Sequence, residues 1–202
     1  MADPHEEFGW LAGYGPFYAI SCVSFVRSLP PIEALTRLGA GAETLEEVTF
    51  EKLQERTMAC LDSDPMRSYV GVVELGGWTA LIELWTASMM GYQPMLGRLS
   101  RATEVVLINR NIHATDYFVH AIDGVTLTWF DLLVPQVRTG SDPDRLINAM
   151  KEVGLNPDHG WDDPVLEATF PRSFALARTI TGLPFSENVL DMRFLSAVID
   201  NG

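Results

Sequence analysis

The clearest pattern in the chain is a pair of apolar runs joined by two turn-forming residues, and it occurs twice. In the first instance, residues 69–75 and 78–84 flank a Gly-Gly pair, which suits the positive φ angles of a two-residue hairpin turn. We therefore predict an antiparallel hairpin in which Val72 faces Leu81.

The second instance is stronger, because residues 116–122 and 125–131 flank Asp123-Gly124, a pair that favours a type I′ turn. A plain two-residue hairpin places Asp116 opposite Asp131. It also gathers six side chains on one face, which we predict to be the core side: Phe118, His120, Ile122, Val125, Leu127 and Trp129.

The remaining segments indicate further strands and several helices. Residues 17–27 are rich in β-branched and aromatic types, which favours a strand and leaves a helix as the alternative. Residues 104–109 are also typical of a strand. Capping residues and apolar spacing predict helices near 32–38, 52–61, 94–100, 141–153, 164–181 and 186–198.

Together these elements predict an α+β fold: one antiparallel sheet of about five to six strands containing two hairpins, helices packed mainly on one side, and a helical C-terminal segment. The 202 residues fit a single domain. Within it we expect an N-terminal tail (1–14), a sheet-rich core with two short helices (15–135) and a helical C-terminal part (136–202).

Composition places the chain among soluble globular proteins, with 47% hydrophobic and 20% charged residues. Cys22 and Cys60 lie in apolar contexts and are interpreted as buried thiols. The first residues are acidic where a signal peptide is basic, and no apolar run approaches the ~20 residues of a membrane span. We expect a cytoplasmic protein that does not bind membranes.

The net charge of −13, from 27 acidic and 14 basic residues, argues against binding to nucleic acid. It indicates either solubility alone or a basic protein partner. Two groups of acidic residues could steer such a partner, and Trp161 is a candidate for the same surface. The groups are Glu43, Glu46, Glu47, Glu51 and Glu55, and Asp142, Asp144, Asp158, Asp162 and Asp163.

Motifs for phosphate loops, nucleophile elbows and zinc sites are missing from the sequence, so we predict no cofactor and no metal. His113, Asp116 and His120 are metal ligands by type, but their spacing matches no established motif, and His120 fits a hydrogen-bonded core imidazole better.

The predicted pairing of Asp116 with Asp131 is the most specific place to look for a site. Like charges about 5 Å apart are unfavourable unless something compensates them. Either the hairpin splays and both carboxylates point into water, or Arg110, Arg138, a bound cation or a partner's basic side chain balances them. The candidate binding residues are therefore Arg110, His113, Asp116, Asp131 and Arg138.

Several short motifs resemble an actinobacterial family of unknown function. They are Cys22-Val23-Ser24-Phe25-Val26-Arg27 and the segments 37–40, 77–83, 110–111, 123–124, 130–131 and 138–144. The resemblance covers roughly residues 20 to 155. It implies a bacterial, cytoplasmic setting and a shared fold, and it brings no activity, substrate or catalytic residue.

Three functions stay open at this point, and the balance leans away from an enzyme. The first is an acidic protein that binds a partner protein, in the manner of an immunity or inhibitor protein. The second is an enzyme or small-ligand-binding protein with its site around Asp116 and Asp131. The third is a subunit of a larger assembly, whose oligomeric state the sequence leaves open and whose sign would be an exposed apolar patch at Phe185, Leu190, Phe194 and Leu195.

Overall fold

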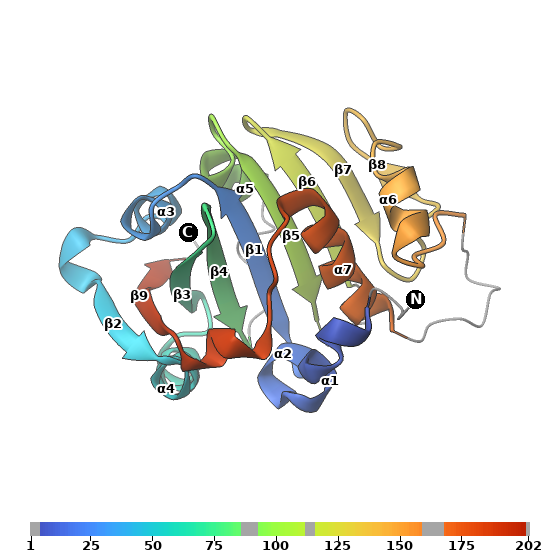
Figure 1. The fold of residues 1–202 in the computed structure, drawn as a ribbon. Helices are drawn as coiled ribbons and strands as arrows, with labels where there is room; N and C mark the ends of the chain where they lie inside the picture. Colours follow the sequence, from blue (N-terminus) through green and yellow to red (C-terminus); the bar gives the residue numbers. More distant parts are fainter. Residues whose placement is uncertain (1–4, 86–92, 112–115, 159–167, 201–202) are drawn as a thin grey trace.

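A computed structural model describes residues 5–85, 93–111, 116–158 and 168–200, and its centre is one antiparallel sheet (Figure 1). Its nine described strands follow the order β2-β9-β3-β4-β1-β5-β6-β7-β8. Their bounds are β1 Ser21–Arg27, β2 Glu46–Thr49, β3 Arg67–Leu75, β4 Trp78–Leu84, β5 Glu104–Arg110, β6 Tyr117–Ile122, β7 Val125–Asp131, β8 Arg138–Thr139 and β9 Arg193–Asp200.

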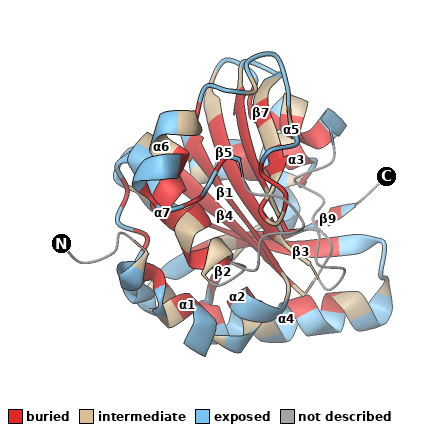
Figure 2. Ribbon diagram, turned by 90° about the vertical axis from the view of Figure 1, so that its right-hand side faces the viewer, coloured by how far each residue is buried: buried red, intermediate tan, exposed pale blue. Residues whose placement is uncertain are grey.

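Helices cover both faces of this sheet, so most of its strands are buried between two layers (Figure 2). Five of the seven described α-helices pack on one face, and α3 and α5 pack on the other. The helices are α1 Trp10–Gly13, α2 Gly15–Ala19, α3 Pro31–Leu38, α4 Phe50–Ser63, α5 Gln93–Leu99, α6 Ile147–Glu152 and α7 Thr169–Thr181. None of the described helices has the length and apolar character that a membrane span requires.

The first hairpin has the predicted register, with Val72 opposite Leu81. Gly76 and Gly77 supply the positive φ angles of its turn, at 53° and 84°. The predicted strand over 17–27 is confirmed from residue 21 onward, where it pairs with both β4 and β5. Its first residues belong instead to α2.

The second hairpin follows the prediction only near its turn. Ile122 faces Val125, but a bulge between His120 and Ala121 leaves Leu127 without a partner in the ladder. Beyond the bulge the register shifts by one residue, because a bulge sets two residues of one strand against one of the other. Asp131 therefore faces Tyr117, and the predicted pairing with Asp116 is wrong.

The same shift overturns part of the predicted core face. Phe130, not Trp129, faces Phe118, and the two phenyl rings stack with centroids 5.4 Å apart. Trp129 faces Val119 and packs on the opposite side of the sheet. A one-residue slip moves every following side chain of a strand to the other face.

The predicted helix over 186–198 is wrong. A short 3₁₀ helix over Glu187–Asp191 is followed by β9, which pairs with β2 and β3. Phe194 and Ala197 are both fully buried but on opposite faces of the sheet. A strand with two buried faces reads as a nearly continuous apolar run, which periodicity cannot distinguish from a helix.

Three strands, β2, β8 and β9, bring the sheet from the predicted five to six strands to nine. The region after 136 is therefore not wholly helical, and the region 15–135 holds four described α-helices instead of two. The N-terminal residues are also not a tail, because a 3₁₀ turn over Glu6–Phe8 and α1 bury Phe8 and Leu11.

The role of β9 as a core strand predicts unequal effects of two substitutions on it. Phe194 is fully buried and its ring lies 5.9 Å from that of Phe50, so Phe194→Ala should lower the free energy of unfolding by about 3–5 kcal/mol. Val198 is 38% exposed, and Val198→Ala should cost less than about 1 kcal/mol. Urea-induced unfolding measures both, and equal costs would contradict this placement of β9.

Candidate functional site

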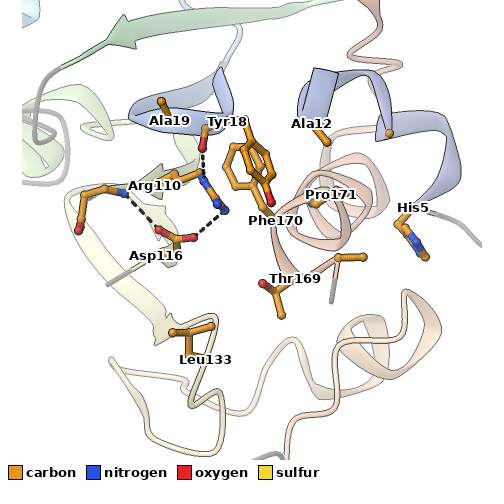
Figure 3. Close-up of a pocket in the computed structure, with 13 residues that line it drawn as sticks. His5, Ala12, Tyr18, Ala19, Arg110, Asp116, Leu133, Thr169, Phe170 and Pro171 are labelled. Atoms are coloured by element: carbon orange, nitrogen blue, oxygen red, sulfur yellow. Dashed lines mark hydrogen bonds and ion pairs between the residues drawn. The ribbon is translucent and has the colours of Figure 1, made fainter. Parts of the chain in front are cut away.

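A pocket of about 650 Å³ lies where the ends of β1 and β5 meet α1, α2 and the start of α7 (Figure 3). Its walls combine small and aromatic side chains with two oppositely charged groups. The described residues that line it are His5, Gly9, Ala12, Tyr18, Ala19, Arg110, Asn111, Asp116, Leu133, Ala168, Thr169, Phe170 and Pro171.

Strand pairing at the centre of the sheet brings these walls together. Ser21, the first residue of β1, lies opposite Arg110, the last residue of β5. The Ser21 hydroxyl donates a hydrogen bond of 2.8 Å to the carbonyl of Phe17, which fixes the end of α2 above that pair. On the other side, α7 packs against β5 and carries Phe170 to the pocket wall.

The guanidinium of Arg110 is held in place by four contacts. Nη1 forms an ion pair of 2.9 Å with Oδ2 of Asp116, and Nε donates to the carbonyl of Tyr18. The guanidinium carbon lies 4.1 Å from the ring centroid of Tyr18 and 4.9 Å from that of Phe170. Such contacts orient a planar cation and shield it from water. Nη2 has no hydrogen-bonding partner among the residues that the structure describes.

Asp116 is only 7% exposed, and both of its carboxylate oxygens accept hydrogen bonds. Oδ2 accepts from Arg110, and Oδ1 accepts from the backbone N–H of Asn111 at 3.1 Å. Burial raises the pKa of Asp116 above its ordinary value of 3.8, while Arg110 and the Asn111 N–H hold the rise down. The Asp131 charge adds a smaller rise to this pKa.

Two of the five candidate binding residues lie outside the pocket. Asp131 accepts a hydrogen bond of 2.8 Å from the N–H of Leu133, and burial raises its pKa. Arg138 pairs with Asp144 at 3.0 Å and donates to the carbonyls of Pro135 and Pro157, so it ties two loops together. Of the five, Arg110 and Asp116 line the pocket, Asp131 and Arg138 are not among its described lining residues, and His113 lies outside the described part of the chain.

The partner surface predicted around the first acidic group is partly neutralised by the chain itself. Arg193 pairs with Glu47 at 3.0 Å and Lys52 with Glu55 at 2.5 Å. Glu46 is half-buried and binds both Arg56 and the Tyr69 hydroxyl. Glu43 and Glu51 are exposed and have no basic partner in the described part of the chain. Trp161 lies outside that part.

The two acidic groups do not form one continuous surface. The first lies at the β2 edge of the sheet, whereas Asp142 and Asp144 lie beside β8 at the opposite edge (Figure 1). Strands are ~4.8 Å apart, so the two edges are roughly 35–40 Å from each other. Asp162 and Asp163 fall outside the described residues.

Two further sequence hypotheses concern buried residues. His120 is 2% exposed and its Nε2 lies 2.8 Å from Oε1 of Glu104, which fits the predicted core imidazole. Burial lowers its pKa, and Glu104 opposes that shift. Groups of three or more potential metal ligands do not occur among the described residues. The exposed apolar patch that would mark an assembly subunit is not formed by the four residues considered for it, since Phe185 and Phe194 are buried and Leu190 and Leu195 are partly buried.

Sequence reasoning missed the two aromatic walls of the pocket. Tyr18 fell within a predicted strand and Phe170 within a predicted helix, and neither element was linked to Arg110. The three residues are far apart in the chain, and they meet only through the pairing of β1 with β5 and the packing of α7.

Comparisons with known proteins give one match. The model of a family described as "Family of unknown function (DUF6461)" matches residues 4–201. Searches of curated proteins and of solved structures found no match.

The electrostatics of the pocket predict how Asp116 responds to the loss of its partner. Arg110→Gln should raise the pKa of Asp116 further, because the attraction of the guanidinium is removed while burial remains. NMR titration of the aspartate carboxyl carbons measures this. Arg193→Gln, which removes an exposed arginine at the far edge, should leave the Asp116 pKa unchanged.

The sign of the effect on stability follows from proton linkage. The native pKa of Asp116 lies above its unfolded-state value, so the native state binds more protons in the window between them. The free energy of unfolding therefore falls as pH rises through that window, and Arg110→Gln should extend the fall to higher pH. An Asp116 pKa that is lowered or unchanged in Arg110→Gln would contradict this account of the pair.

Proposed function

Since the chain belongs to a family of unknown function, we propose from its own geometry that the protein binds a small organic molecule in the pocket beside Arg110. One observation carries this proposal. A guanidinium fixed by Asp116 and two aromatic rings lines the pocket with one nitrogen, Nη2, uncommitted among the described residues.

The size and lining of the pocket support the same proposal. Sites for small molecules commonly measure ~300–1,000 Å³ and combine apolar walls with a few placed polar groups. The volume of about 650 Å³ falls within that range. Tyr18, Ala12 and Leu133 supply accessible apolar surface, and Arg110 supplies the oriented polar group.

The proposal is for binding without a reaction. Both oxygens of Asp116 already accept hydrogen bonds from the chain, so the carboxylate serves to position Arg110.

Binding of a basic protein partner stays a prediction and ranks below the pocket. Its support is the net charge of −13 and the exposed Glu43 and Glu51. Ion pairs with Arg193, Lys52 and Arg56 offset much of the charge at the first acidic group, so less of it remains to attract a basic partner.

A steric block provides the test of the proposed function. Ala12 lines the pocket and is exposed, so Ala12→Trp should fill the cavity without disturbing the core. A library of small neutral, acidic and basic compounds, screened by ligand-observed NMR, should give binders that this variant loses. Ala42→Trp introduces the same side chain at an exposed position outside the pocket and should keep them. Binders that survive Ala12→Trp, or a screen without binders, would overturn the proposal.

A further inference from the structure

We infer that the ligand of this pocket is a monocarboxylate, with its carboxylate on Arg110 and an apolar body against Tyr18 and Leu133. The inference rests on the proposed function and names the chemical class of the ligand. It comes from the charges and hydrogen-bonding groups that remain available at the pocket wall.

Two oppositely charged side chains line the described part of the pocket. Arg110 is the permanent cation among the described lining residues, and Asp116 is the carboxylate. One carboxylate oxygen of Asp116 accepts a hydrogen bond from Arg110, and the other accepts one from the N–H of Asn111. The remaining hydrogen-bonding capacity of this charged pair is on the donor side, because Nη2 carries two N–H groups and no acceptor function. A ligand complementary to this wall must supply an acceptor.

The surroundings of Arg110 make a charged acceptor more favourable than a neutral one. The arginine side chain is 21% exposed, and aromatic rings cover part of the guanidinium. An ionic hydrogen bond in such a shielded place is stronger than one in open water. Guanidinium groups pair with both carboxylates and phosphates, so the charge balance of the site must distinguish between them.

The start of α7 adds positive electrostatic potential at the pocket wall, the same sign as that of Arg110. Residues 168–171 line the pocket, and the 13-residue helix begins there with no acidic residue in its first turn and no side-chain cap at Ala168. The N-terminal end of a helix carries partial positive charge, which favours an anion nearby. This contribution supports Arg110 and does not replace it.

The charge of the site also limits the ligand to a single negative charge. A phosphate monoester carries about −1.5 to −2 at neutral pH, and one arginine that already pairs with Asp116 leaves much of that charge uncompensated. The net charge of −13 repels anions at long range, so any acid that binds is held by these local contacts. The apolar walls then select the body of the ligand.

Matched acids and amides test this inference on the unaltered protein. The probes are phenylacetate, 3-phenylpropionate and 4-phenylbutyrate, the primary amide of each, and inorganic phosphate. At neutral pH and fixed salt, at least one acid should bind about tenfold or more tightly than its amide, because the amide lacks the ionic contact. Titration by NMR or calorimetry measures the ratio.

Two arginine variants connect the preference to its residue. Arg110→Gln should bring the affinity for the acid down to that for its amide, whereas Arg193→Gln, at the far edge of the sheet, should preserve the difference. The acid-to-amide ratio of the unaltered protein keeps the test valid even where Arg110→Gln impairs folding.

The outcomes separate this inference from the proposed function. Amides that bind as tightly as the acids, a preference for phosphate, or no binding by any acid would overturn the carboxylate assignment. If Ala12→Trp still abolishes the binding of other compounds, the pocket remains the binding site. Acids that bind equally well to Ala12→Trp would overturn both.

Discussion

Every side chain of β4 is buried, so the sheet at the centre of this protein must be covered on both of its faces. This constraint explains why segments from both ends of the chain pack against it. Phe8 and Leu11 come from the N-terminal turns, Phe174 and Phe185 come from the region after residue 168, and all four belong to one apolar cluster. α3 and α5 cover the other face with Leu35 and Leu96.

The pocket lies at the corner where this covering layer is assembled from separate pieces. α1 and α2 precede β1, α7 comes from much later in the chain, and β5 ends beneath them. Arg110 stands at this junction and touches all three parts: Tyr18 of α2, Phe170 of α7 and Asp116 before β6. The same side chain thus links the pieces of the layer and lines the cavity between them. A buried charge pair of this kind adds little net stability, which is consistent with a role in recognition.

Local patterns predicted the parts of the fold that depend on neighbouring residues in the chain. The Gly-Gly turn gave the register of the first hairpin, and the helix over 52–61 was recognised from Thr49, whose hydroxyl accepts the N–H of Lys52. Local patterns did not predict the parts of the fold that depend on residues far apart in the chain. β9 has two apolar faces only because the sheet is buried on both sides, and Tyr18 meets Arg110 only because β1 pairs with β5. For the site, the sequence identified Arg110 and Asp116 but not the aromatic rings that orient them.

One extra residue in β7 decides the chemistry at the base of the pocket. Without the bulge at Leu127, the Asp-Gly turn would set Asp116 directly against Asp131, and two carboxylates would face each other. The shift puts Tyr117 opposite Asp131, whose carboxylate instead accepts the N–H of Leu133. Asp116 is then left beside Arg110 as its partner at 2.9 Å. β-bulges commonly re-aim side chains next to functional sites, and here the bulge separates two like charges and leaves Asp116 free to orient Arg110.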